Sequence, residues 1–424
     1  MKIMVVGGGG REHAIIKKLK ENPLADKIYA LPGNGGIAKD AECVKIGAKE
    51  LDKIVAFATE NEIDFAVVAP DDPLVLGLVD LLEEKGIPCF GPRKNAAIIE
   101  GSKAFSKDLM KKYGIPTAQY ETFTDADKAL EDVKGHKLPL VVKADGLALG
   151  KGVLICNTRE EAIDAVNSIM NDRIFGASGA AVVVEEFLTG PEVSVLSFTD
   201  GNVVIPMVSS MDHKRAHDND EGLNTGGMGT IAPNPFYTDE VAERCMKEIF
   251  LPTMQAINAE GRTFKGCLYF GLMITEDGPK VIEYNCRFGD PETQVVLPLL
   301  KTDLLTIMLA ISEGKLNELN VEFDTGAAAC VILASGGYPV SYEKGKEINL
   351  GMSEEIENVL VYHAGTAIEG GKLVTSGGRV LGVTATADKL DEAIKRAYLA
   401  AYEISFDESF MRHDIGRRAL KALK

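Results

Sequence analysis

Long apolar runs are missing from the sequence, and so is any surplus of positive charge. No stretch of the 424 residues approaches the roughly 20 apolar residues that a membrane-spanning helix needs, so we expect no membrane segment. The formal net charge is −17 at pH 7, which argues against a general surface for polyanions. Nucleic acid is therefore not an expected partner, although local basic pockets could still bind phosphates.

Cysteine is sparse, and no leader segment is visible. The seven cysteines are scattered and odd in number, without a Cys-x-x-Cys pair, which indicates reduced and mostly buried thiols. Met1 leads directly into the strand-like residues 3–6, without the basic stretch and apolar core of a secretory signal. We expect a cytoplasmic protein. No repeat or low-complexity tract is present, and nothing in the sequence indicates a protein partner.

The composition is that of a globular protein with more than one core. Hydrophobic residues make up 46% of the chain and charged residues 26%. A chain of 424 residues exceeds one ordinary core and suggests about two to four compact units.

The first 90 residues alternate short apolar runs with helical patterns. This alternation predicts a doubly wound α/β domain. The expected strands are residues 3–6, 28–31, 65–69 and 87–90. The loops that follow these strands lie at the carboxyl ends of the sheet, where such folds bind small molecules. These loops are residues 7–10, 32–34 and 70–73.

The rest of the chain predicts two α+β regions. The middle region has short strands separated by Gly-rich turns, at residues 140–143, 153–156, 181–187, 193–198 and 203–208. The last hundred residues predict strands at residues 327–334, 359–362 and 378–386, followed by a helix over 389–404. Residues 218–229, rich in Gly and Asn, are typical of a mobile functional loop.

A strand near residue 283 presents a metal ligand pair beside a cation. Glu283, Asn285 and Arg287 alternate, so their side chains share one face. A carboxylate and an amide oxygen suit a hard cation such as Mg²⁺, and a guanidinium can bind a carboxylate or phosphate through two hydrogen bonds. The alternative is a solvated polar face.

A glycine-rich loop runs from the first strand into a helix. Its backbone amides, in residues 7–10, and the helix N-terminus can hold an anion. Glu12 occupies the place of the third glycine of a dinucleotide fingerprint, and no acidic residue follows Leu31, so NAD binding is disfavoured. Arg11 and His13 fit a single sugar phosphate better. The alternative is a tight turn flanked by ordinary surface residues.

A second glycine-punctuated loop follows Lys143. Lys143 can pair with phosphate oxygens, while Gly146 and Gly152 let the loop close over a triphosphate. The segment is not a Walker loop, because Lys151 is followed by Gly and Val rather than by a hydroxyl residue and a helix. Two surface lysines beside a flexible hairpin are the alternative.

The strand at residues 182–192 offers features of an adenosine site. Its backbone could read the adenine rim, with Leu188 as an apolar contact and Glu192 placed to accept ribose hydroxyls. Glu185 and Glu186 alone are typical of a charged strand end. Lys103 opens a helix and could face phosphate, although a lysine in a first turn is commonly solvated.

The order of these elements resembles the ATP-grasp superfamily, and six motifs narrow the resemblance to the phosphoribosylamine glycine ligase family. These motifs lie at residues 7–14, 101–105, 143–148, 212–215, 224–229 and 285–294. Later runs at residues 334–339, 363–366, 375–384 and 414–416 also resemble that family. The resemblance spans nearly the whole chain.

The resemblance implies a multidomain α/β and α+β fold. Residues 1–100 would form an N-terminal doubly wound α/β domain that binds substrate. Residues 101–320 would form an ATP-grasp domain with a lid at about 116–187, and residues 321–424 a small C-terminal α+β domain. The implied reaction joins glycine to 5-phosphoribosylamine with ATP in purine biosynthesis, through glycyl phosphate.

The resemblance also implies roles for individual residues. The implied nucleotide-binding residues are Lys103, Lys143, Gly146, Lys151, Gly152, Glu185, Glu186, Leu188 and Glu192. Glu283 and Asn285 would bind Mg²⁺, with Mn²⁺ possible, while Arg287, Asp290 and Lys143 would act in catalysis. The implied substrate-binding residues are Gly8, Gly9, Gly10, Arg11, His13, Asn34, Asp72, Asp212, Lys214, Asn224, Thr225, Gly226, Arg287 and Asp290.

One local feature and two rival functions keep alternatives open. Many ATP-grasp enzymes carry a further acidic ligand on the preceding strand, where this chain has Gly271, Leu272 and Met273. Another ATP-grasp ligase or a carboxylase of purine biosynthesis would share the ATP site, but should lack the motifs at 224–229 and 287–292. A silent nucleotide-binding regulator should have lost Lys143, Glu283 or Asn285, and all three are present.

Overall fold

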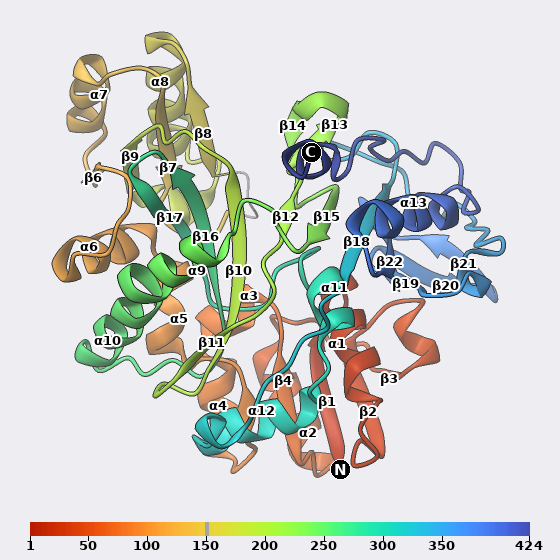
Figure 1. Ribbon diagram of the computed structural model, residues 1–424. Helices are drawn as coiled ribbons and strands as arrows, with labels where there is room; N and C mark the ends of the chain where they lie inside the picture. Colours follow the sequence, from red (N-terminus) through yellow and green to blue (C-terminus); the bar gives the residue numbers. More distant parts are fainter. Residues whose placement is uncertain (149–151) are drawn as a thin grey trace.

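The computed structural model describes residues 1–148 and 152–424. In this part of the chain, four sheets of four or five strands and two hairpins are arranged around a central cleft. Figure 1 shows the N-terminal sheet at the bottom, the lid with α7 and α8 at the upper left, and the C-terminal sheet at the right. The multidomain α/β and α+β arrangement that the sequence predicts is confirmed.

The N-terminal sheet is fully parallel, with the order β3-β2-β1-β4-β5. Its strands are β1 (Lys2–Gly7), β2 (Lys27–Pro32), β3 (Glu42–Cys43), β4 (Phe65–Val68) and β5 (Cys89–Phe90). Its helices are α1 (Gly10–Leu19), α2 (Leu51–Glu60), α3 (Asp71–Leu76), α4 (Leu78–Glu84) and α5 (Lys94–Gly101). The four predicted strands are confirmed. The two-residue β3 carries too short a signal to predict.

The lid is a four-stranded antiparallel sheet covered by two helices. Helix α6 (Lys103–Tyr113) leads into the sheet, whose order is β6-β9-β7-β8. The lid consists of β6 (Tyr120–Phe123), α7 (Ala126–Gly135), β7 (Leu140–Ala144), β8 (Val153–Cys156), α8 (Arg159–Val166) and β9 (Val182–Glu186). Its buried apolar residues form a cluster of their own, separate from the core of the base. The lid therefore packs as its own unit.

A second antiparallel sheet, β11-β10-β16-β17, forms the base opposite the lid. It contains β10 (Glu192–Thr199), β11 (Val204–Pro206), β16 (Gly266–Thr275) and β17 (Gly278–Asn285), with α9 (Asp239–Cys245) and α10 (Leu251–Ala259) nearby. A turn at residues 276–277 joins β16 to β17. The pairing carries a bulge between Gly271 and Leu272, so Gly271 rather than Leu272 lies opposite Glu283.

The C-terminal sheet draws strands from two distant parts of the chain. Its order is β12-β15-β18-β22-β19, and β12 (Met211–Asp212) and β15 (Gly229–Ala232) come from the middle of the sequence. The other elements are α11 (Thr293–Val296), α12 (Leu304–Glu313), β18 (Ala327–Ala334), β19 (Val359–His363), β20 (Thr366–Glu369), β21 (Lys372–Thr375), β22 (Arg379–Ala387), α13 (Leu390–Ala401) and α14 (Arg417–Ala422). The middle of the chain thereby joins the base to the C-terminal unit.

Residues 218–229, expected to form a mobile functional loop, include regular secondary structure. The segment holds β14 (Glu221–Asn224), which pairs with β13 (Arg215–His217), and it ends in β15. The C-terminal segment anchors this hairpin, because Arg412 binds Asp220 at 2.9 Å and the carbonyl of Arg215 at 3.1 Å. Composition alone cannot reveal this anchor, which lies almost 200 residues away.

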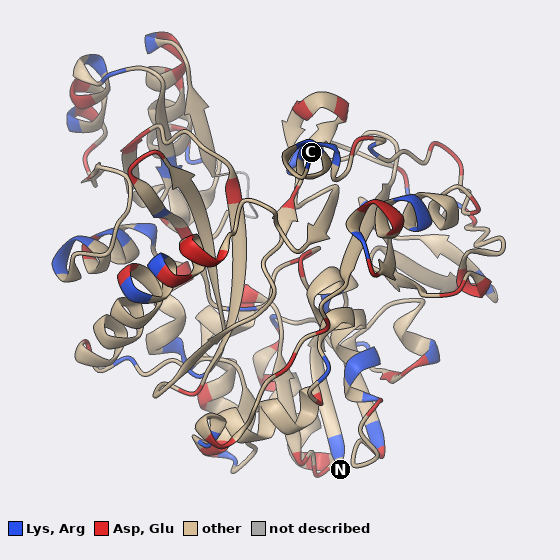
Figure 2. Cartoon of the chain, viewed as in Figure 1, with Lys and Arg blue, Asp and Glu red and all other residues tan. Residues whose placement is uncertain are grey.

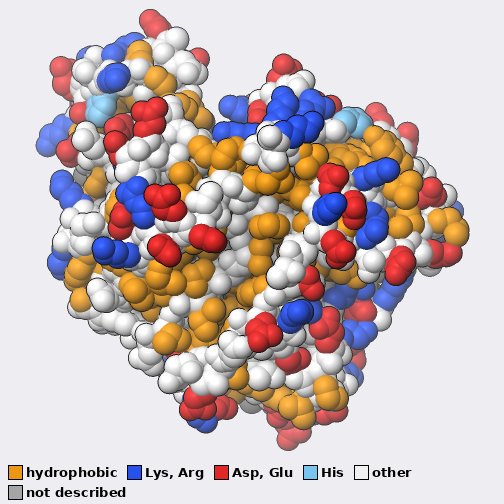
Figure 3. All heavy atoms as spheres, in the orientation of Figure 1, with side chains coloured by type: hydrophobic (Ala, Val, Ile, Leu, Met, Phe, Trp, Pro, Cys, Tyr) orange, Lys and Arg blue, Asp and Glu red, His pale blue; other side chains and the backbone are white. Residues whose placement is uncertain are grey.

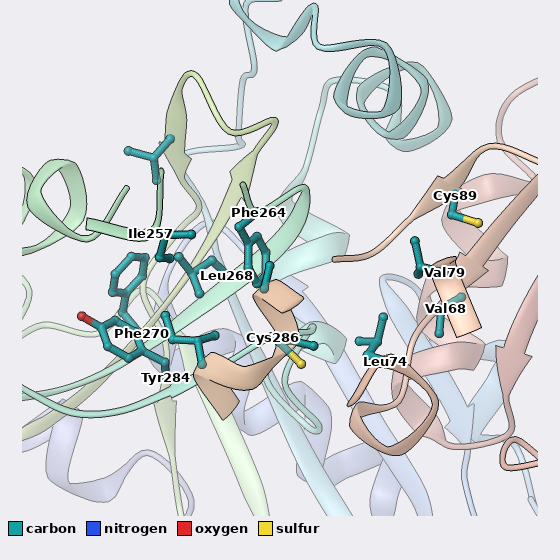
Figure 4. Packing of buried hydrophobic residues seen from close by; sticks show 14 of the residues in the cluster. Val68, Leu74, Val79, Cys89, Ile257, Phe264, Leu268, Phe270, Tyr284 and Cys286 are labelled. Atoms are coloured by element: carbon teal, nitrogen blue, oxygen red, sulfur yellow. The ribbon is translucent and has the colours of Figure 1, made fainter. Parts of the chain in front are cut away.

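One apolar core joins the N-terminal sheet to the base sheet. Figure 4 shows Val68, Leu74 and Val79 of the N-terminal unit in the same cluster as Phe270 and Tyr284 of the base. This shared core fixes the carboxyl ends of β1 and β4 relative to β17.

Acidic and basic residues are interspersed along the chain in all parts of the fold (Figure 2). Among the described residues, no helix combines the length and apolar character that a membrane crossing requires.

Candidate active site

A cleft of about 930 Å³ opens between the lid, the base sheet and the C-terminal unit. Most of the residues proposed from sequence line it. They are Arg11, Lys103, Lys143, Gly152, Glu185, Glu186, Leu188, Glu192, Asp212, Lys214, Asn224, Thr225, Gly226, Glu283, Asn285, Arg287 and Asp290. Lys151 lies outside the described residues.

The two metal-ligand candidates project from β17 into the cleft. Burial opposes ionisation of Glu283, but the charges of Lys214 and Lys143 outweigh it, so the pKa of this carboxyl is lowered. The Asn285 amide nitrogen donates to Oε1 of Glu100 at 3.0 Å, in the amide orientation that satisfies both of its polar atoms. Its oxygen then points away from Glu100. A carboxylate and an amide oxygen at this position fit a hard cation that phosphate oxygens help to hold.

Glu100 is a buried carboxylate that the sequence interpretation missed. It accepts a hydrogen bond from the backbone N–H of Cys286 at 2.7 Å and one from Nη2 of Arg287 at 2.8 Å. Burial raises its pKa, and the Arg287 charge opposes this effect. The Nε atom of Arg287 is buried without a hydrogen-bond partner. Arg287 therefore keeps a donor for an incoming acceptor while Glu100 fixes its orientation.

Three lysines meet on the lid side of the cleft. Lys143 Nζ lies 3.0 Å from Oε2 of Glu185, and Lys107 Nζ lies 3.2 Å from Oε1 of the same carboxylate. Lys103 donates to the carbonyl of Gly146 at 2.9 Å, and burial lowers its pKa. Gly146 itself is packed against Ser178, where a Cβ would lie 2.5 Å from the hydroxyl. Lys107 was not predicted, since a lysine one turn into a helix carries no signal of its own.

Asp290 is held by neighbours from both ends of the chain. Its carboxylate accepts from Nε2 of Gln294 at 2.8 Å and from the backbone N–H of Arg11 at 3.3 Å, and it lies 3.6 Å from Arg379. Although burial opposes it, the charge of Arg379 lowers the Asp290 pKa. Arg379 was missed as a site residue, although it lies within the motif at 375–384. Asp290 therefore links the backbone of Arg11 to the side chain of Arg379 beside the cleft.

Asp212 faces a second carboxylate in the cleft. Burial and the charge of Glu292 raise the pKa of Asp212 well above its usual value. The Tyr269 hydroxyl donates to Oε1 of Glu292 at 3.1 Å. Lys214 bridges toward Glu192 and Glu283, at 3.6 and 3.8 Å. This pair of neighbouring carboxylates is suited to a cation.

The loop after the hairpin is ordered by short contacts. Thr225 donates from its hydroxyl to the carbonyl of Lys214 at 2.8 Å, and the N–H of Gly226 donates to the Tyr338 hydroxyl at 3.1 Å. Asn224 pairs with Arg215 in the hairpin. These residues therefore line the cleft from a fixed backbone.

The structure does not bring His13 or Asn34 to the cleft. His13 is buried, with Nε2 3.0 Å from Asp40 and Nδ1 accepting from the His363 N–H at 2.8 Å. The Asn34 amide nitrogen donates to the carbonyls of Gly8 and His363, at 2.9 and 2.8 Å. Both side chains join the N-terminal unit to the C-terminal unit. The sequence does not show these contacts, because the motifs that make them lie far apart along the chain.

Two further expectations at the N-terminal sheet need correction. Asp72 faces outward and pairs with Lys49 at 3.1 Å, while its neighbour Asp71 lines the cleft. The sequence alone does not show which of the adjacent residues Asp71 and Asp72 lines the cleft. The Gly9 N–H is already bonded to the carboxylate of Glu12 at 2.7 Å. The Gly9 amide is therefore occupied, and binding of an anion by the Gly8 and Gly10 amides stays a prediction.

Basic side chains gather beside the cleft despite the acidic total charge. Figure 3 shows them around the C-terminal helix α14, and Arg417, Arg418 and Lys421 line the rim. A positive rim raises the local concentration of anionic ligands.

Comparisons with known proteins agree with this geometry. Models of the phosphoribosylglycinamide synthetase N domain, ATP-grasp (A) domain and C domain match residues 1–100, 101–293 and 328–418. A phosphoribosylamine–glycine ligase of Caldanaerobacter subterraneus is 50% identical over 98% of this chain and 99% of its own length. One from Halalkalibacterium halodurans is 48% identical over 99% of this chain and 97% of its own length.

A solved structure shares the whole fold. The crystal structure of the phosphoribosylamine–glycine ligase of Thermotoga maritima is 36% identical, with a TM-score of 0.85 over 98% of this chain and 100% of that chain. The predicted ATP-grasp architecture is thereby confirmed. The chain belongs to the phosphoribosylglycinamide synthetase family.

Proposed function

We propose that this protein is an ATP-dependent ligase that joins glycine to 5-phosphoribosylamine, giving glycinamide ribonucleotide, ADP and phosphate in purine biosynthesis. The observation that carries the proposal is one cleft that holds a metal-ligand pair, buried lysines, an oriented arginine and a carboxylate pair. Full-length relatives named phosphoribosylamine–glycine ligase support the same chemistry. A cytoplasmic location also belongs to the proposal, and the seven unpaired cysteines suit a reducing compartment.

We assign the nucleotide to the lid side of the cleft. Lys103 and Lys143 neutralise phosphate charge, and Glu192 accepts from ribose hydroxyls. Glu283 and Asn285 hold Mg²⁺ together with phosphate oxygens; in the described residues no cluster of three His, Cys, Asp or Glu offers a complete site without the nucleotide. When bound, Mg²⁺ stabilises charge on the transferring phosphoryl group.

We assign glycine to the space between Arg287 and the Asp212–Glu292 pair. The partner-free Nε of Arg287 can donate to the glycine carboxylate. The ammonium group of glycine would relieve the repulsion that raises the Asp212 pKa. We prefer this pair to Asp290 for the ammonium group, because Gln294 and the Arg11 N–H already bind the Asp290 carboxylate.

The two bond changes then follow from these positions. A glycine carboxylate oxygen attacks the γ-phosphorus of ATP, the bond to the ADP oxygen breaks, and glycyl phosphate forms. The amine of phosphoribosylamine attacks the carbonyl carbon, and phosphate leaves with that oxygen. We assign the phosphate of phosphoribosylamine to the side where the backbone N–H of Arg11 and the side chain of Arg379 meet at Asp290. Closure of the lid keeps water from the acyl phosphate.

A phosphate-release assay with ATP and Mg²⁺ tests the proposal. Glycine and freshly generated phosphoribosylamine are omitted in turn, and bicarbonate replaces glycine in one arm. We expect full turnover only with both substrates, and no turnover with bicarbonate. Phosphate release that is independent of glycine, or supported by bicarbonate, would refute the assignment. The Glu283→Gln variant, measured under the same conditions, gives the background rate of phosphate release.

A further inference from the structure

Lys107 is a buried cation that the proposed chemistry does not use. Its side chain is 3% exposed, and its ammonium group shares the Glu185 carboxylate with Lys143. Burial lowers the pKa of Lys107 to about 8, with the charge of Glu185 opposing the effect, so the group is largely charged at neutral pH. One buried carboxylate therefore lies between two buried ammonium groups.

These contacts close a ring between the lid and the base sheet. Lys107 donates to the Thr117 hydroxyl at 2.7 Å, and that hydroxyl donates to the carbonyl of Val281 at 2.7 Å. Lys143 donates to the carbonyl of the next residue, Ile282, at 3.2 Å. Thr117 lies just before the first lid strand, β6. The ring thus ties β7 and β9 of the lid to β17, beside the Glu283 and Asn285 side chains.

The surroundings of Lys107 leave it poorly placed to bind phosphate itself. Its ammonium donates to Thr117, pairs with Glu185 and lies 5.7 Å from the centre of the Tyr120 ring. Two lysines and one glutamate leave a net charge of one positive unit. Without Lys107, the full Glu185 charge would act on Lys143 and cancel the cation that faces the phosphates.

We propose that Lys107 is a positioning residue for nucleotide binding: it shares Glu185 with Lys143, so that Lys143 of β7 keeps its contact with β17 and its positive charge remains available to the phosphates. The inference rests on the proposed function only in assigning Lys143 to the nucleotide phosphates. Lys107 acts through Glu185 and does not touch the nucleotide.

Calorimetric titration with ADP and Mg²⁺, without glycine, tests this role. We expect Lys107→Met to weaken ADP binding about tenfold, the effect of losing one charge-assisted contact. Lys107→Arg keeps a cation beside Glu185 and should bind within about threefold of the wild type. Lys111→Met, an exposed lysine one turn further along α6, should bind like the wild type.

Two results would overturn the inference. One is unchanged ADP binding in Lys107→Met; the other is a Lys107→Arg variant as weak as Lys107→Met, which a merely structural role for the ring would give. If Lys107→Met folds poorly by thermal unfolding, Lys107→Gln, which keeps a polar side chain without the charge, takes its place: a tenfold loss supports the inference and unchanged ADP binding refutes it. Because glycine is absent, these outcomes are separate from a failure of glycine-dependent phosphate release.

Discussion

Arg287 donates from Nη2 to Oε1 of Glu100 at 2.8 Å, across 187 positions of the sequence. The same carboxylate oxygen orients the Asn285 amide. The buried Glu100 carboxylate on α5 therefore orients both Asn285, a metal-ligand candidate, and Arg287, the arginine that we assign to glycine. This pair joins the end of the N-terminal unit to the last residues of the base sheet.

Arg287→Lys tests the proposed glycine contact. A lysine could keep the Glu100 ion pair, but it has no second planar donor for a carboxylate. We expect kcat/KM for glycine to fall about 100-fold while the Kd for ATP changes less than about threefold. Steady-state kinetics and ATP titration measure the two quantities. Equal losses in both would move Arg287 into the nucleotide site.

Asp212→Asn tests the ammonium site. The change removes one charge of the Asp212–Glu292 pair, so we expect the KM for glycine to rise about tenfold with little change in the KM for ATP. Asp391→Asn, at an exposed position of α13, is the matched control and should behave like the wild type. An unchanged KM for glycine would exclude Asp212 from this role.

Gly227→Ala tests whether the loop backbone must approach the carboxylates. Gly227 has φ +122°, and a Cβ there would lie 2.5 Å from Pro291 and 2.6 Å from Oδ1 of Asp212. We expect a loss of about 1–3 kcal/mol in the free energy of unfolding and weaker glycine binding. Gly135→Ala, where a Cβ meets nothing within 4 Å, should stay within about 0.5 kcal/mol. Equal stability of the two variants would contradict this account.

Because His213 is buried, we expect the free energy of unfolding to fall in acid. Its Nδ1 donates to the Gly229 carbonyl at 3.0 Å, and its Nε2 accepts from the Gly416 N–H at 3.1 Å. Burial and the Arg412 charge lower its pKa to about 4. The unfolded chain takes up a proton near pH 6.5 that the folded chain does not bind until about pH 4, so the free energy of unfolding falls as the pH drops through this window.

Thermal unfolding from pH 7 to pH 5 measures this effect. His213→Asn keeps a donor for the Gly229 carbonyl but removes the titration, so its melting temperature should fall less than that of the wild type. Burial also lowers the pKa values of His13 and His363. These two residues contribute equally to the fall in melting temperature of both proteins. Identical slopes for both proteins would refute the assignment to His213.

Much of the site could be predicted because its residues follow local rules. Glu283, Asn285 and Arg287 alternate along one strand, and a strand places alternate side chains on one face. Lys143 follows an apolar strand that is just as easy to recognise. The strands of all three regions carry period-two or continuous apolar runs, and their positions are confirmed within a few residues.

The remaining features depend on contacts between distant segments. Glu100, Lys107 and Arg379 have meaning only beside partners that other elements supply, so no local pattern marks them. His13 illustrates the converse: its place beside a glycine loop suggested a ligand, but His363 and Asp40 occupy both ring nitrogens. The pairing of β15 with β18 is likewise a long-range event, and it anchors the end of the segment that was expected to be a loop.

Transfer of oxygen from glycine to phosphate tests the central claim most directly. The protein is incubated with ATP, Mg²⁺, phosphoribosylamine and glycine labelled with ¹⁸O in both carboxylate positions, and the released phosphate is analysed by mass spectrometry. The account predicts one ¹⁸O atom in each phosphate, because the glycine oxygen that attacks the γ-phosphorus leaves with it. Phosphate without ¹⁸O, formed alongside glycinamide ribonucleotide, would show that the carboxylate is not phosphorylated.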